Sequence, residues 1–313
     1  MAGDTKATAF VTGAAGFIGT ELIKTLVEGG HPAFGLVRSL EAADRVRQAG
    51  GTPVMGDLLE PGQWQDEAAA EWVFHLPPHP LRRRRVTRRR AEAIARDRVL
   101  MDAHLLDTVA AGPTQRILYV ADTSSYGATG LRAITEDEPL RPTVWGRCLA
   151  PALDRLDGYV VAGLPIVTAL PGWVYGQASW LRHRVIDPVM AGRRVLQFGR
   201  TGPWVSPIHV HDCARALVHL AEHGEAGGRY FVVNSHPVRT SAFAETFARL
   251  AHRPLRTWRV PASAARFMVG PVVADEIQNG AVYSNIRLRG IGFRFKYPTL
   301  EQGLQQILGA LDE

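Results

Sequence analysis

The sequence has few cysteines and no long apolar run. Its two cysteines, Cys148 and Cys213, lie far apart in the chain and form neither a metal-ligand nor a redox spacing. No apolar stretch reaches the ~18 residues that a membrane-spanning helix needs. The first ten residues also carry no signal-peptide pattern. We therefore expect a reduced, cytoplasmic protein with no membrane partner.

Positive charge is in excess, but the excess is local. The net charge is +6, and seven arginines lie between Arg82 and Arg90. Three interpretations of this arginine run are open: a solvated helix start or loop, a surface that attracts the cofactor's phosphates or an acidic substrate, and a nucleic-acid site. We favour the first and expect no nucleic-acid partner.

The stretch from Thr8 to Glu28, TAFVTGAAGFIGTELIKTLVE, predicts a strand, a tight turn and a helix. Gly13 permits the turn, Gly16 lets backbone N–H groups approach a pyrophosphate, and Gly19 lets the helix pack closely on the strand. The helix N-terminus favours an anion. This combination predicts a dinucleotide-binding site.

Apolar strands and helical patterns then alternate. Strands are expected at His31–Val37, Pro53–Gly56, Trp72–Leu76 and Arg116–Val120. Such alternation over 313 residues, 46% of them hydrophobic, predicts an α/β fold with a parallel sheet and a sizeable core. The end of the second strand lacks the acidic residue that binds the ribose 2′-hydroxyl of NAD and has Arg38 and Ser39 instead. A guanidinium attracts a 2′-phosphate, so we expect NADP(H) as the cofactor.

The segment TGAAGFIG resembles the TGxxGxxG signature of the extended short-chain dehydrogenase/reductases, which include sugar-nucleotide epimerases and dehydratases. The segments LPGWVYGQ, PIHVHDCA and FRFKYPTLEQGLQQIL are also similar to that family. The resemblance implies a Rossmann doubly wound parallel sheet with a smaller C-terminal α/β substrate domain. We expect residues 1–170 plus about 207–235 in the NADP-binding domain and about 171–206 plus 236–313 in the substrate-binding domain. The resemblance also implies a homodimer with contacts through residues 91–110 and 145–162. The nearby arginine run counts against such a dimer.

The glycine turn and the family resemblance together predict a set of positions that contact the cofactor. They lie in the turn, at the ends of the next strands, and in LPGWVYGQ. The set is Gly13, Gly16, Phe17, Ile18, Gly19, Arg38, Ser39, Asp57, Leu58, Leu76, Pro77, Pro78, Pro171, Gly172 and Val174.

The expected reaction centre departs from the family. A Ser or Thr that orients the substrate carbonyl falls on Asp122, so Thr123 or Ser124 would have to serve instead. In the family's YxxxK motif, Tyr transfers the proton and Lys lowers its pKa. Here Trp145 and Leu149 occupy those two positions, and neither can transfer a proton at neutral pH.

We therefore expect an NADPH-dependent ketoreductase that resembles the angucyclinone ketoreductases, with an aromatic polyketide ketone as a substrate that supplies its own proton. Four tryptophans are candidates for stacking on it: Trp145, Trp173, Trp180 and Trp204. Two alternatives are open. One is a catalytically inactive NADPH-binding regulator, and the other is a sugar-nucleotide epimerase or dehydratase with a non-standard acid such as His211. We expect no metal, because His209 and His211 lack a third ligand, and we expect Asp212 to cap the next helix.

Overall fold

Seven parallel strands form one sheet. The computed structural model describes residues 6–77, 85–278 and 280–312, and its main sheet has the order β12-β7-β5-β4-β1-β2-β3. The strands are β1 (Ala9–Thr12), β2 (Ala33–Val37), β3 (Thr52–Met55), β4 (Trp72–His75), β5 (Arg116–Val120), β7 (Ile166–Pro171) and β12 (Arg229–Val232). The strand order reverses between β1 and β4, and in open α/β sheets ligands bind at such a switch point. The predicted doubly wound Rossmann fold is confirmed.

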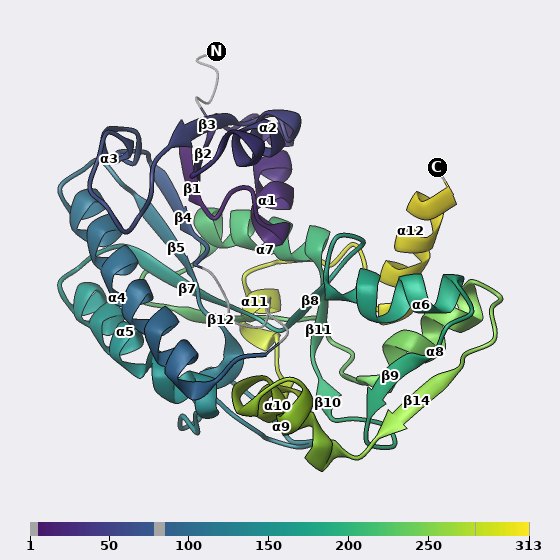
Figure 1. Cartoon of the computed structure of the whole chain (residues 1–313). Coiled ribbons are helices and arrows are strands. Elements are labelled where there is room, and N and C mark those ends of the chain that lie inside the picture. The colour runs from purple at the N-terminus through teal and green to yellow at the C-terminus, as the bar shows by residue number, and fades with distance from the viewer. Residues whose placement is uncertain (1–5, 78–84, 279, 313) are drawn as a thin grey trace.

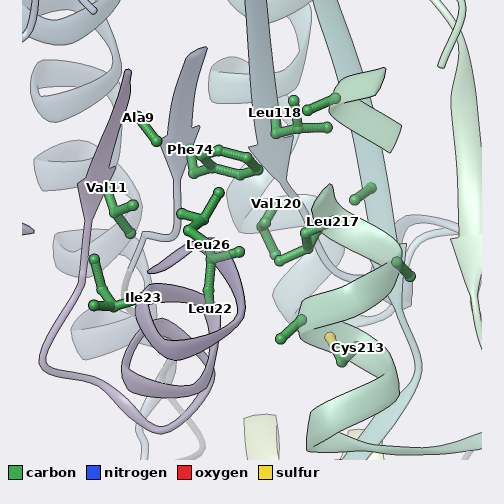
Figure 2. Close-up of a cluster of buried hydrophobic side chains, with 14 of the residues drawn as sticks. Ala9, Val11, Leu22, Ile23, Leu26, Phe74, Leu118, Val120, Cys213 and Leu217 are labelled. Atoms are coloured by element: carbon green, nitrogen blue, oxygen red, sulfur yellow. The ribbon is translucent and has the colours of Figure 1, made fainter. Parts of the chain in front are cut away.

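Helices cover both faces of this sheet (Figure 1). One face carries α1 (Phe17–Glu28), α2 (Leu40–Gln48) and α7 (Val210–His223), and the other carries α3 (Trp64–Glu67), α4 (Arg88–Ala110) and α5 (Val144–Val161). Figure 2 shows the core of the first face, where Leu22 and Leu26 of α1, Leu217 of α7 and Phe74 of β4 belong to one apolar cluster. These helices bury apolar faces against the sheet, as their 3.6-residue pattern predicts.

The remaining elements form short ladders and helices beside the sheet (Figure 1). The ladders pair β6 (Ala133–Ile134) with β15 (Val282–Tyr283), β8 (Trp173–Tyr175) with β11 (Pro207–His209), β9 (Val195–Phe198) with β14 (Thr257–Val260), and β10 (Trp204–Val205) with β13 (Val238–Arg239). The helices are α6 (Asp187–Met190), α8 (Ser241–Leu250), α9 (Ala265–Met268), α10 (Pro271–Gln278), α11 (Ile286–Gly290) and α12 (Leu300–Asp312). Phe243, Phe247 and Leu304 lie in a separate apolar core between these elements.

The start of α7 differs from its prediction. His209, not Asp212, is the N-cap, and its side chain accepts a hydrogen bond from the His211 N–H at 3.3 Å. Asp212 lies inside the first turn, fully buried, and accepts from the backbone N–H groups of Lys296 and Tyr297 at 2.8 and 2.7 Å. The carboxylate therefore ties the C-terminal segment to α7.

Candidate functional site

The glycine turn is closed so tightly that only glycine fits. Gly13 has φ of +65°, and a Cβ there would lie 2.4 Å from the Leu76 carbonyl oxygen. A Cβ at Gly19 would lie 2.2 Å from the Gly13 carbonyl oxygen. Gly16 is the N-cap of α1 and provides no side-chain cap, so the first-turn N–H groups stay available to an anion. The turn therefore fits the pyrophosphate of a dinucleotide.

The ends of β2 and β3 bring three predicted residues together. The Arg38 guanidinium is 72% exposed and lies 3.4 Å from the Asp57 carboxylate. Asp57 also accepts from the Leu59 N–H at 3.0 Å, and the Ser39 hydroxyl caps α2 by accepting from the Ala42 N–H at 3.2 Å. An exposed ion pair of this kind contributes little stability, so Arg38 can turn to a phosphate at small cost.

Two further predicted cofactor positions follow β3 and β7. Leu58 is buried, and its backbone carbonyl accepts from His104. Gly172 follows β7 and packs against the backbone of Ser206, since a Cβ there would lie 2.1 Å from the Ser206 carbonyl oxygen. Pro78 lies outside the described residues, as do Arg82, Arg83 and Arg84 of the arginine run.

At the expected reaction centre, two departures from the family bind each other. The Trp145 indole N–H donates to one oxygen of the Asp122 carboxylate at 2.8 Å, across 23 residues of sequence. The other oxygen accepts from the Ser124 N–H at 2.9 Å and from the Ser124 hydroxyl. Trp145 is completely buried and Leu149 is 1% exposed. The Asp122 carboxylate therefore accepts hydrogen bonds both from the loop after β5 and from α5.

Two side chains predicted for this centre are buried. Ser124 is buried and gives its hydroxyl hydrogen to Asp122, so it does not face a carbonyl. Trp145 has no exposed surface on which a substrate could stack. Thr123 remains as the candidate for carbonyl orientation, because it is partly exposed.

Tyr283 is a phenol at this centre that the sequence analysis missed. Its hydroxyl donates to the Thr123 carbonyl oxygen at 3.3 Å, and its ring packs on Phe231 with centroids 4.6 Å apart. Burial raises the pKa of Tyr283, so the phenol stays protonated. Residue 283 follows Thr123 by 160 positions, so no local pattern joins the two.

A buried polar chain runs beneath the strand ends. Thr12 accepts from the Leu76 N–H and bonds Nδ1 of His75 at 2.7 Å, and Nε2 of His75 bonds the Asp102 carboxylate at 2.8 Å. Tyr119 of β5 and Arg98 of α4 complete the chain. Tyr119 donates to Asp102 at 2.5 Å and accepts from Nε of Arg98 at 2.9 Å.

Arg98 gives this chain a buried positive charge, since it is only 3% exposed. Burial alone lowers the pKa of Arg98, but Tyr119, Asp102 and Asp122 outweigh burial and raise that pKa. Burial likewise raises the pKa of Tyr119. The charge of Arg98 therefore stabilises both Asp102 and the Asp122 carboxylate at the reaction centre. The sequence contains two signals for this polar chain. One is a His at the end of an apolar strand, and the other is an Arg and an Asp four residues apart in the next long helix.

The other three tryptophans are partly covered by neighbouring groups. Trp180 donates its indole N–H to the Val174 carbonyl at 3.2 Å and packs edge-on against Trp173, with centroids 5.3 Å apart. The Arg239 guanidinium covers the Trp204 ring at 4.8 Å. All three rings are partly exposed.

The two histidines considered as metal ligands have other partners. His209 caps α7, and Nδ1 of His211 lies 3.0 Å from the Glu21 carboxylate of α1. The hydrogen bond from His211 is the main cause that lowers the pKa of Glu21. The His211–Glu21 pair therefore joins α7 to α1, the helix that follows the glycine turn.

The described part of the arginine run lies at the start of α4. Arg88 lies 3.1 Å from Glu92, and Arg89 and Arg90 are exposed. α4 and α5, for which dimer contacts were expected, pack side by side on one face of the sheet (Figure 1). Within the described residues, no helix is long and apolar enough to cross a membrane.

Comparisons with known proteins agree with this architecture. An epimerase family protein of Staphylococcus aureus (strain MRSA252) is 30% identical over 112 residues, which cover 36% of this chain and 37% of the relative. An uncharacterized protein of Schizosaccharomyces pombe is 61% identical over 49 residues, which cover 16% of this chain and 17% of that protein. The matches thus span about a third or less of these relatives' lengths.

Solved structures match over nearly the whole chain. The human epimerase family protein SDR39U1 with NADPH has a TM-score of 0.77 at 20% identity and covers 96% of this chain and 99% of its own. The UDP-glucose 4-epimerase of Thermus thermophilus with NAD has a TM-score of 0.76 at 19% identity, with 97% and 99% covered. At these identities the likeness shows the fold. The model of the NAD dependent epimerase/dehydratase family matches residues 9–234, and the chain therefore belongs to this family of NAD(P)-binding extended short-chain dehydrogenase/reductases.

Proposed function

We propose that the chain is an NADPH-dependent ketoreductase whose substrate supplies the proton. The observation that carries this proposal is the Trp145–Asp122 hydrogen bond at the reaction centre. An indole N–H does not ionise near neutral pH, and Leu149 has no donor, so the usual proton carrier is missing. Tyr283, the phenol at this centre, is buried with a raised pKa and donates to the Thr123 carbonyl oxygen, so we assign the proton to the substrate instead.

The choice of NADPH rests on Arg38. Its exposed guanidinium lies at the end of β2, where NAD-preferring proteins of this fold have an acidic residue. The human relative SDR39U1 was solved with NADPH, although the Thermus epimerase was solved with NAD. Bound NADPH would supply the hydride to the carbonyl carbon.

The substrate class follows from the missing acid. General acid catalysis typically contributes a factor of about 10² to 10⁴, so an unassisted ketone would react slowly. A phenol beside the ketone, as in aromatic polyketides, can give its proton to the carbonyl oxygen, and water then reprotonates the phenolate. Thr123 is the side chain we assign to orient the carbonyl, and Trp173 is a partly exposed ring for a flat substrate.

A matched pair of substrates tests this mechanism. The protein is incubated with NADPH and an aryl ketone that has a free neighbouring phenol, and with the same ketone methylated at that phenol. We expect methylation to suppress NADPH oxidation by about 10² or more, and by more than Thr123→Val does. Equal rates for the two ketones would overturn the substrate-assisted scheme.

A second candidate is an NADPH-binding regulator without turnover. It is favoured by the way Trp145 and Ser124 already engage the Asp122 carboxylate, which closes the centre on itself. Tight NADPH binding with no oxidation on any ketone of a hydroxyaryl panel would support this candidate over the reductase. Failure to bind either pyridine nucleotide would overturn both.

A further inference from the structure

Three potential metal ligands lie on one face of the last turn of α7. His219, Glu222 and His223 are spaced i, i+3 and i+4, which places their side chains side by side on a helix. One ligand atom from each lies within 4.8 Å of the others. The two imidazole rings have centroids 4.4 Å apart and cross at 61°, so they are neighbours without being stacked face to face.

The ring of His219 is already oriented by a second contact. Its Nε2 lies 2.9 Å from the Ile291 carbonyl oxygen, in the segment after α11. A carbonyl only accepts, so Nε2 carries the hydrogen and Nδ1 keeps its lone pair. Metal-binding histidines almost always donate their other ring N–H to such an oxygen, which fixes the tautomer and the ring.

Phe293 supports the same ring, with centroids 5.5 Å apart, and His219 is half-buried between α7 and this segment. Glu222 and His223 are exposed, so they can rotate without repacking the core. Tetrahedral ligands at 2.0–2.1 Å from an ion lie about 3.3 Å apart. Side-chain rotation alone can bring the three ligand atoms from within 4.8 Å to this separation, because His219 is held in place while Glu222 and His223 are exposed.

We propose that His219, Glu222 and His223 bind a divalent transition-metal ion of the zinc class, with water in the fourth position. Two imidazoles and one carboxylate suit Zn²⁺, Co²⁺ or Ni²⁺, whereas Mg²⁺ and Ca²⁺ prefer oxygen ligands. The site is separate from the reaction centre and does not depend on the proposed function. A bound ion would fix the last turn of α7 and, through His219, its contact with the segment that follows α11.

Cobalt(II) is a direct probe, because tetrahedral coordination gives it strong visible absorption. Tag-free full-length protein is titrated with Co²⁺ and then with Zn²⁺, and thermal unfolding is followed with each ion and with Mg²⁺. We expect a visible band that Zn²⁺ removes, and a rise in the unfolding temperature with Zn²⁺ but not with Mg²⁺.

Single substitutions locate the ion. We expect His223→Ala and Glu222→Gln each to weaken Zn²⁺ binding by about tenfold or more, and His219→Ala to abolish the cobalt band. His183→Ala is the matched control, because His183 is also an exposed helical histidine four residues from a carboxylate, Asp187. It should leave binding unchanged.

The exposed His223 variant keeps the test decisive even if His219→Ala fails to fold. An unchanged cobalt band in His223→Ala, or the absence of any band in the parent protein, would overturn the proposal.

Discussion

At the end of β2, Arg38 is placed to distinguish two cofactors by one phosphate. Its guanidinium is exposed and weakly paired with Asp57, so a 2′-phosphate can replace that partner. We expect Arg38→Ala to raise the Kd for NADPH by about 10- to 100-fold, since hydrogen bonds between charged groups contribute about 1.5–3 kcal/mol. The Kd for NADH should stay within about twofold.

Fluorescence titration with both reduced cofactors measures this effect. Arg47→Ala is the control, because Arg47 is an exposed arginine of α2 paired with Asp44. Equal weakening of both cofactors would show that Arg38 does not read the 2′-phosphate.

Trp145 and Asp122 form a partly buried pair whose loss should be costly. Trp145→Phe keeps an aromatic ring but removes the N–H that Asp122 accepts at 2.8 Å. Leaving a carboxylate short of a donor costs about 1–3 kcal/mol, and we expect the unfolding free energy to fall by that amount in urea titrations. Trp258→Phe, at a 56% exposed position, should change it little. Similar effects from the two variants would contradict the role given to the indole.

Part of this site could be predicted from the sequence, and part could not. The loss of the Tyr and Lys is visible at Trp145 and Leu149, because it depends on spacing along one helix. That Ser124 serves Asp122, and that Arg98 lies buried near the same carboxylate, depends on side chains meeting across the fold. Composition cannot reveal such contacts, since Arg98 lies in a helix rich in exposed charge.

Among the elements, α5 depends on a helix far along the chain. The N–H of Val144 donates to the Asp275 carboxylate of α10 at 2.7 Å, and the cap residue Thr143 donates to Glu276. Negative charge at a helix N-terminus is stabilising by about 0.3–1 kcal/mol, and by up to about 2 kcal/mol when partly buried. α10 therefore holds the end of α5 from which Trp145 projects.

We expect Asp275→Ala to lower the unfolding free energy by about 1–2 kcal/mol and Asp275→Asn, which keeps an acceptor, by less. Added salt should shrink the difference between the parent and the Asn variant. Thermal unfolding measures these differences, and Asp97→Ala, at an exposed position of α4, is the control. If Asp97→Ala destabilised the chain as much, the capping role would be wrong.

Most of the strands and the long helices could be predicted, because each is marked by an apolar pattern between turn residues. α4 begins at Arg88, three residues before the stretch 91–110 for which dimer contacts were expected, and Thr87 supplies its cap. α10 was not predicted, and its contact with Val144 spans 131 residues. A short helix that contributes carboxylates to a distant partner has no local signature.

Across the whole molecule, one buried histidine should contribute to the loss of stability in weak acid. Burial lowers the pKa of His209 from 6.5 to about 4, despite the opposing effect of Asp212. Between these values the unfolded chain binds a proton that the folded chain does not, so the unfolding free energy falls as the pH falls. Over this window the loss approaches about 3 kcal/mol.

His209→Asn keeps an acceptor for the cap of α7 but cannot titrate. Urea unfolding between about pH 4 and 7 should therefore show a flatter dependence for this variant than for the parent. His183→Asn removes an 85% exposed histidine and should preserve the slope. An unaltered slope in His209→Asn would assign the acid sensitivity to other groups.

The edge strand β12 has a consequence for how the chain is made. It pairs with β7, yet residues 172–228 lie between them in sequence. During translation the ribosome must add that whole intervening stretch before β7, already flanked by β5, gains its second neighbour. Until then the nascent polypeptide presents an apolar strand with unpaired amides, the kind of surface that chaperones cover and that otherwise seeds aggregation.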